Sequence, residues 1–158
     1  MKTHSIIIFL ALSALLASCS TEKKDMTAPE IVSAGEETSP LNCAEYHPGD
    51  IIQFVWAFSD DVELGSFNVE IHSNHDHHTH STEAEDCPEH HHDEGEEEGE
   101  LWIFNEDYPI PSGQTYYKTN IPIAVPANAA HGEYHFMIRV TDAAGWQQLR
   151  SLAINIEE

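Results

Sequence analysis

The segment Leu64–His80 has the sequence LGSFNVEIHSNHDHHTH. In its first half Phe67, Val69 and Ile71 alternate with polar residues, and this period of two predicts a β-strand with one apolar face. Its second half is unusually rich in histidine, at His72, His75, His77, His78 and His80. Neutral imidazole is the commonest protein ligand of transition metals. The segment therefore predicts a strand that runs into a metal-binding loop.

Short apolar segments with strand periodicity occur on both sides of this one. We expect further strands at residues 28–32, 51–58, 101–104, 116–123, 133–141 and 148–156, separated by turns rich in Gly, Pro, Asn and Asp. About seven short strands without an amphipathic helix are typical of an all-β fold, an Ig-like antiparallel β-sandwich. Tyr134, which follows Gly132 and Glu133, has the position of the tyrosine corner of such sandwiches.

The chain is strongly acidic, with 6 Lys and Arg against 28 Asp and Glu and a net charge of −22. This charge argues against nucleic acid as a partner and against attraction to anionic lipid. Much of it lies in a His-rich, acidic loop at residues 73–100, where His90, His91 and His92 precede the sequence DEGEEEGE. Such low complexity predicts disorder. The insert either collects cations weakly or only solubilises the protein.

The N-terminus has the pattern of a bacterial lipoprotein signal. Met1–Ser18 holds Lys2 and then an apolar run too short to span a bilayer, and the sequence Leu-Ala-Ser-Cys ends at Cys19. This motif resembles the lipobox, at which Cys19 becomes diacylated. We expect a flexible tether at residues 19–28, a domain at residues 29–158, and attachment to the membrane through lipid. Ser20 after the lipidated Cys resembles outer-membrane lipoproteins, exposed to the periplasm or at the cell surface.

Two further cysteines, Cys43 and Cys87, would then lie in an oxidising compartment. A disulfide between them would stabilise the fold and restrict the histidine-rich loop. The alternative is that both are thiolate metal ligands, which the lack of a CxxC pair makes less favoured.

A second histidine lies on a distant strand. In an Ig sandwich the strand from Leu64 and the strand from Glu133 are antiparallel neighbours, which places His72 beside His135, with both side chains pointing away from the core. Opposed residues have Cβ atoms about 4.5–5.5 Å apart, so two imidazoles can share one cation. The preferred ligand set is His72, His77, His80 and His135, with His75 and His78 as substitutes. Glu70 or Asp76 is expected to add an oxygen or to orient an imidazole.

All-nitrogen ligation suits Zn²⁺ first, then Cu²⁺ or Ni²⁺. The sequence thus predicts a cell-envelope lipoprotein that buffers, captures or passes on a divalent cation, with a metal-transport protein as a possible partner. The alternative is an adhesion or assembly module that binds protein or glycan through Trp102, Tyr116, Tyr117 and Trp146, with any metal only structural. No HExxH, GxSxG or paired nucleophile and base is present, so we do not expect an enzyme.

Five parts of the chain together resemble a known family: the opening APEI, FSDDVEL, the strand that ends in VEIHSNHDHHTH, the block IPIAVPANAAHGEYHFMIRVTDAAGW and the closing INI. The family comprises uncharacterised Ig-like lipoproteins of Gram-negative bacteria that contain a domain of unknown function. The resemblance covers roughly residues 28–157, and the acidic insert departs from it. It implies a sandwich fold and secretion, and it implies no particular reaction.

Overall fold

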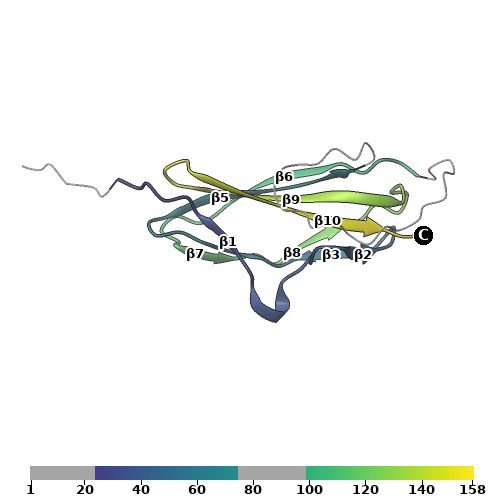
Figure 1. The fold of residues 1–158 in the computed structure, drawn as a ribbon, viewed down its shortest axis with the longest axis horizontal. Helices are drawn as coiled ribbons and strands as arrows, with labels where there is room; N and C mark the ends of the chain where they lie inside the picture. The colour runs from purple at the N-terminus through teal and green to yellow at the C-terminus, as the bar shows by residue number, and fades with distance from the viewer. Residues whose placement is uncertain (1–23, 75–98) are drawn as a thin grey trace, which may run out of the picture.

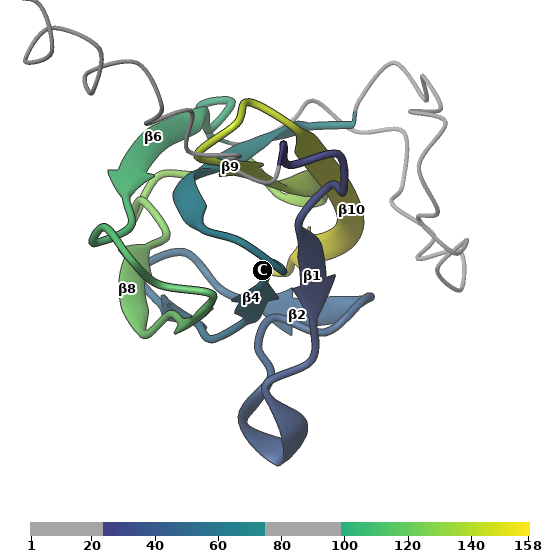
Figure 2. The ribbon, with the colours of Figure 1, turned by 90° about the vertical axis from the view of Figure 1, so that its left-hand side faces the viewer.

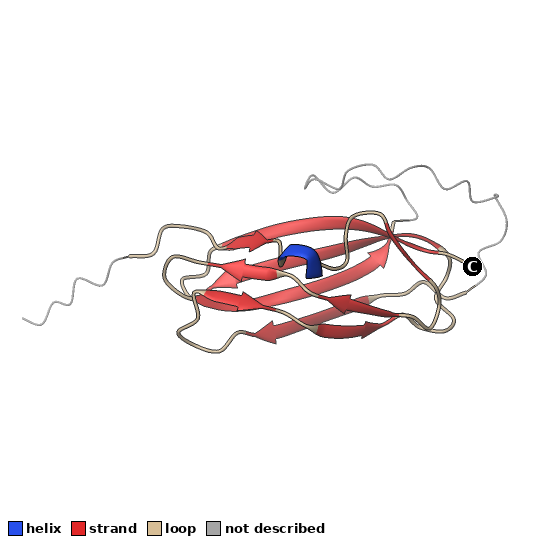
Figure 3. Ribbon diagram, turned by 90° about the horizontal axis from the view of Figure 1, so that it is seen from below, coloured by secondary structure: helices blue, strands red, loops and turns tan. Residues whose placement is uncertain are grey.

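A computed structural model describes residues 24–74 and 99–158, which form two packed layers of β-strands (Figure 1). Within these residues the only helical element is a single 3-10 turn at Gly35–Glu37, drawn in blue in Figure 3. The strands are β1 (Glu30–Val32), β2 (Ala44–Tyr46), β3 (Ile51–Phe54), β4 (Ala57–Ser59), β5 (Leu64–Ser73), β6 (Phe104–Pro109), β7 (Tyr116–Lys118), β8 (Ile121–Ala124), β9 (Gly132–Asp142) and β10 (Gln147–Ile156).

One layer is a five-stranded sheet in the order β2-β10-β9-β5-β6. Its three long strands, β5, β9 and β10, are antiparallel, and β2 joins the edge of β10 in parallel. The pairing of β5 with β9 slips between Leu64 and Ser66. Gly65 permits this close approach, because a Cβ there would lie 2.8 Å from the carbonyl oxygen of Asp142.

The opposite layer consists of two short sheets, β1-β4-β7 and β3-β8. The chain passes from β3 to β4, and from β7 to β8, with a short break between the two strands. Both breaks lie at the same place, where Trp56 contacts the buried Thr119. The Trp56 backbone N–H donates to Thr119 Oγ1 at 2.9 Å, and the Thr119 hydroxyl lies 3.0 Å from the Phe54 carbonyl oxygen. A side chain thus supplies the hydrogen bonds that the broken strand ladder lacks.

The core lies between the layers, which enclose it when the sandwich is viewed from one end (Figure 2). Aromatic rings connect the two layers. The Phe54 ring lies 6.1 Å from the Phe67 ring and 5.7 Å from the Phe136 ring, measured between centroids, and all three side chains are buried. Each comes from the apolar face of an alternating strand, so the period of two in the sequence directly determines the core.

The predicted tyrosine corner is confirmed. The hydroxyl of the buried Tyr134 donates to the Ala130 carbonyl oxygen at 2.9 Å, and it accepts from the Trp102 backbone N–H at 3.4 Å. The hydroxyl therefore joins the crossover before β9 to the segment that leads into β6. Such a bond to the backbone a few residues upstream is the hallmark of Ig-like sandwiches.

The all-β sandwich is confirmed, but it has ten strands where about seven were expected. The predicted strand 51–58 is split into β3 and β4, and the predicted strand 116–123 is split into β7 and β8. The strand expected at 101–104 was misplaced, because β6 begins at Phe104 and pairs with β5 at the sheet edge. No helix within the described residues is both long and apolar enough to cross a membrane.

Candidate metal centre

His72 and His135 are directly opposed across the β5–β9 pair, as the sequence predicts. Their imidazole ring centroids are 5.4 Å apart, with an interplanar angle of 47°. Both follow from strand alternation, since Ile71 and Tyr134 face the core on either side of them. The predicted pairing of the two histidines is therefore confirmed, while metal ligation by them stays a prediction.

The pair is less exposed than the sequence suggested. His135 is only 4% exposed, and the His72 side chain is 21% exposed. Both imidazoles point away from the hydrophobic core, but the surrounding outer face is also buried, including Met137 and Ala153. The predicted direction away from the core therefore holds, but the burial of His135 could not be predicted, because strand periodicity identifies the face of a sheet and not what covers that face.

A carboxylate lies beside the more exposed imidazole. Glu70 Oε1 is 3.2 Å from His72 Nδ1, and the two residues share one side of β5. A carboxylate at one ring nitrogen orients an imidazole and makes its other nitrogen, here Nε2, the natural metal ligand. The structure thus places Glu70 beside His72, and the expectation that Glu70 orients an imidazole stays a prediction.

The chain leaves β5 next to the histidine pair. The Asn74 backbone N–H donates to the Glu133 carbonyl oxygen at 2.9 Å, and the Asn74 side-chain amide contacts the Glu133 carboxylate. These contacts extend the strand pairing one residue beyond Ser73. The start of the predicted 73–100 loop is therefore fixed against β9.

Cys43 lies on the same row of the sheet as the two histidines. Its backbone N–H donates to the Ala153 carbonyl oxygen at 2.8 Å, and the Ala153 N–H donates to Asn42 Oδ1 at 2.8 Å. Ala153 in turn opposes His135 on β9. With strands about 4.8 Å apart, Cys43 is roughly 10 Å from His135 and one strand further from His72. Cys43 is disulfide-bonded, which argues against its role as a thiolate ligand.

Several predicted site residues lie outside the described residues. They include the lipidation residue Cys19, the predicted disulfide partner Cys87 and the loop histidines His75, His77, His78 and His80, so their roles stay predictions. Within residues 24–74 and 99–158, no group of three His, Cys, Asp or Glu that contains both histidines has ligand atoms all within 4.8 Å of one another. A complete coordination sphere would therefore need ligands from elsewhere in the chain.

Sequence reasoning missed a group of acidic side chains at the other end of the sandwich. Asp25, Asp60 and Asp61 each offer an oxygen, and these oxygens lie within 4.8 Å of one another. Asp25 falls within the predicted tether at residues 19–28, and Asp60 and Asp61 follow the predicted strand at residues 51–58. The available signal was the adjacent Asp60-Asp61 pair immediately after a buried strand.

The aromatic residues considered for the adhesion alternative do not form one surface. Trp102 is buried in the core and Tyr117 is partly buried against it. Tyr116 and Trp146 are 54% and 44% exposed. An aromatic binding surface built from the predicted residues is thus reduced to two side chains.

The fold and the opposed histidines define an all-β sandwich with a candidate metal centre on its five-stranded sheet. The chain belongs to the family described as domain of unknown function DUF4625, whose model matches residues 17–157. The search of curated proteins found no match. Among solved structures, Spo0M, a sporulation control protein from Bacillus subtilis, is similar with a TM-score of 0.42 and 10% sequence identity. The match covers 84% of this chain and 51% of the Spo0M chain.

Proposed function

We propose that this protein is a cell-envelope lipoprotein that binds a divalent transition metal, Zn²⁺ first, through a histidine cluster. The observation that carries the proposal is the opposition of His72 and His135 across β5 and β9. The proposed role is to buffer, capture or relay the ion, and it involves no catalysis.

The spacing of the two rings suits a shared ion. With Zn–N bonds of about 2.0–2.1 Å and tetrahedral geometry, two imidazoles on one zinc ion have ring centroids about 5 Å apart. The rings of His72 and His135 are 5.4 Å apart. The centroid separation is therefore compatible with one nitrogen of each ring binding the same ion.

Burial favours a firm site over a weak surface one. A His135 side chain with 4% exposure has few alternative rotamers, so less conformational entropy is lost when it binds an ion. Glu70 provides the carboxylate that zinc-bound histidines commonly have at their second nitrogen. These two features separate the pair from an ordinary solvated cross-strand contact.

The remaining ligands are proposed to be His77 and His80, with His75 and His78 as substitutes. The disulfide of Cys43 supports this proposal, because Cys43 lies on the row of the histidine pair. A bridge from Cys43 to Cys87 would return the histidine-rich segment to that row. Its effect would be to raise the local concentration of loop imidazoles near His72 and His135.

The proposed cellular setting follows from the N-terminal sequence. Lipidation at Cys19 would hold the domain at the outer membrane, on its periplasmic side or at the cell surface. A tethered protein with one reversible metal site suits handover of the ion to a membrane transport protein.

Calorimetric titration of the full-length chain with Zn²⁺ tests the site. The wild type should bind one equivalent, and the His72→Gln/His135→Gln double variant should lose that stoichiometric binding. His47→Gln is the matched control, because His47 is exposed and lies in a turn next to Asp50, and it should bind as the wild type does. One equivalent bound at unchanged affinity by the double variant would exclude this site.

The contribution of the disulfide is tested separately. The Cys43→Ser variant should retain zinc binding but with weaker affinity, since the histidine pair remains while the loop is no longer restricted. An unchanged affinity would show that the disulfide does not organise the ligands. A complete loss of zinc binding in a folded Cys43→Ser variant would show that the histidine pair alone does not hold the ion.

A further inference from the structure

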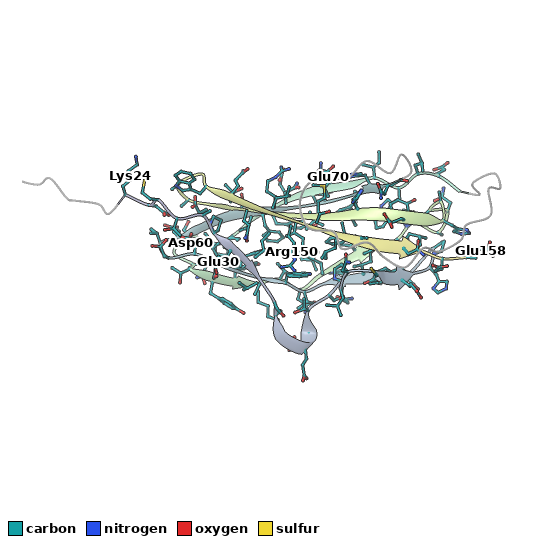
Figure 4. All side chains as sticks on the ribbon, in the orientation of Figure 1. Lys24, Glu30, Asp60, Glu70, Arg150 and Glu158 are labelled. Carbon is teal, nitrogen blue, oxygen red and sulfur yellow. The ribbon has the colours of Figure 1, made fainter. Side chains whose placement is uncertain are left out.

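The end of the sandwich opposite the histidine pair brings together three separate segments. These are the residues before β1, the turn from β4 to β5, and the turn from β9 to β10. In Figure 4, Lys24 and Asp60 are labelled at this end and Glu158 at the other. His72 is eight residues along β5 from Leu64, about 26 Å away at strand spacing. This acidic end is therefore separate from the candidate metal centre.

Three aspartates converge there, and a fourth, Asp142, lies beside the adjoining turn. Oxygens of Asp25, Asp60 and Asp61 lie within 4.8 Å of one another. Asp142 ends β9 opposite Leu64, the first residue of β5. A hydrogen bond of 2.9 Å from the Ala143 N–H to the Glu63 carbonyl oxygen holds the two turns together.

Asp142 carries the independent evidence for a ligand. Its side chain is on the core-facing side of β9, in alternation with Val140, and the residue is only 4% exposed. Its Oδ1 accepts the Trp146 backbone N–H at 2.8 Å. Its Oδ2 is buried and has no hydrogen-bond partner in the described part of the chain. Burying a charged carboxylate oxygen without a hydrogen bond is strongly unfavourable unless a cation balances its charge.

Asp60 repeats this pattern from the facing layer. Its Oδ1 accepts the backbone N–H groups of Val62 at 2.8 Å and Glu63 at 2.7 Å. Its Oδ2 is buried without a hydrogen-bond partner among the described residues. Asp60 and Asp142 therefore lie at the same end of the sandwich, where the hydrogen bond from Ala143 to Glu63 joins their turns.

Trp146 connects this pair to the N-terminal segment. Its indole Nε1–H donates to the Asp25 backbone carbonyl oxygen at 3.3 Å, while its backbone N–H holds Asp142. The Asp25 carboxylate accepts the Thr27 N–H at 3.1 Å. The segment from Lys24 to Thr27 therefore lies against the acidic end, whereas the sequence alone predicts only a flexible tether there.

Lys118, Arg150 and Arg139 have other neighbours. Lys118 is paired with Glu37 at 2.6 Å, and Arg150 lies over the Trp56 ring at 4.8 Å. Arg139 is opposite Asn68 in the middle of the sheet. Within residues 24–74 and 99–158, no Lys or Arg forms an ion pair with the buried oxygens of Asp60 and Asp142.

We propose that Asp25, Asp60, Asp61 and Asp142 bind a calcium ion at the tether-proximal end of the sandwich. Carboxylate and carbonyl oxygens without imidazole or thiolate are the ligands of hard cations, and several carboxylates in irregular turns suit Ca²⁺ better than the rigid octahedral Mg²⁺. The ion would fix Asp25 to the turns at Asp60 and Asp142. Calcium would thereby stiffen the junction between the domain and its membrane tether.

Thermal and denaturant unfolding of the full-length chain with a calcium chelator or with 10 mM CaCl₂ tests the proposal. Calcium sites of extracellular modules have Kd values of about 0.1–1 mM, so saturation should lower the unfolding equilibrium constant by about 10- to 100-fold. Asp60→Asn and Asp142→Asn should abolish this response. Each variant keeps the Oδ1 that accepts backbone hydrogen bonds and loses the buried negative charge. Without calcium, in the presence of chelator, each variant should therefore be at least as stable as the wild type. Glu106→Gln on the edge strand β6 is the matched charge control and should respond as the wild type does.

Terbium luminescence reports on the ion site without reference to stability. Tb³⁺ should be sensitised by Trp146 in the wild type, and excess Ca²⁺ should quench the signal by displacement. Trp146→Phe should lose the sensitised emission. The proposal is overturned if Ca²⁺ does not stabilise the wild type, if Mg²⁺ stabilises it equally, or if Asp60→Asn and Asp142→Asn respond to calcium as fully as Glu106→Gln does.

Discussion

His72 and His135 lie opposite each other on β5 and β9 with ring centroids 5.4 Å apart, yet they differ in burial. His135 is 4% exposed, whereas the His72 side chain is 21% exposed. The two members of the proposed centre thus have different structural roles. His135 is fixed by its surroundings, and His72 lies next to the point where the chain leaves the sheet.

This difference predicts unequal effects of single substitutions on the metal-free protein. His135→Ala should lower the free energy of unfolding by about 1–3 kcal/mol, because it removes a packed side chain and leaves a cavity. His72→Ala should lower it by less than about 1 kcal/mol. Urea unfolding in the presence of a chelator measures both. Equal losses would show that the burial of His135 adds nothing to stability.

The tyrosine corner makes a second stability prediction. Tyr134→Phe removes the hydroxyl that donates to the Ala130 carbonyl oxygen and leaves that acceptor without its partner. The expected loss in the free energy of unfolding is about 1–3 kcal/mol. Tyr108→Phe is the control, since Tyr108 is only partly buried at the edge of the core, and its loss should stay below about 0.5 kcal/mol. A Tyr134→Phe protein as stable as wild type would contradict the assigned role of the corner.

The core between the layers depends on Phe54. Its ring is fully buried against Phe67 and Phe136, so Phe54→Ala should lower the free energy of unfolding by about 3–5 kcal/mol. Ile51, on the same strand, is 56% exposed, and Ile51→Ala should have an effect within about 0.5 kcal/mol. Chemical denaturation of the two variants compares them. Similar losses of stability in the two variants would contradict the assignment of the Phe54 side of β3 to the core.

Tyr46 predicts a loss of stability at high pH. Burial raises the pKa of Tyr46 above its usual value of 10.0, the Asp50 charge raises it further, and a hydrogen bond with Ser39 opposes the shift. As the pH rises above 10.0, the unfolded chain ionises first, so the native state becomes less stable until its own raised pKa is passed. Unfolding measured from neutral to alkaline pH should show a smaller decline for Tyr46→Phe than for the wild type. Identical declines would contradict the shift.

The long strands could be predicted from the sequence because their apolar residues alternate. That alternation predicted β5, β9 and β10. The antiparallel pairing of β5 with β9 predicted that His72 lies opposite His135. The position of Tyr134 predicted the tyrosine corner. Edge strands were harder to predict. The strand β6, FNEDYP, is held by backbone pairing with β5 and has no apolar period. The short strand β2 also lacks an apolar period. It lies in the segment between the predicted strands 28–32 and 51–58, and it is held by pairing with β10.

The parts of both sites that were missed depend on tertiary packing. The period of β9 shows which way His135 faces but not that this outer face is covered. Asp25 lies in a polar stretch without periodicity, and its contact with Trp146 joins residues far apart in the chain. The break in the second layer likewise depends on one long-range side chain, Thr119, at the Trp56 backbone.

The most direct test of the proposed function is the anomalous-difference map at the zinc edge from crystals of the full-length protein grown with Zn²⁺. We predict one strong peak between His72 and His135, about 2.0–2.1 Å from one ring nitrogen of each. A map in which neither imidazole contacts a peak, with zinc bound elsewhere or not at all, would contradict the proposed function.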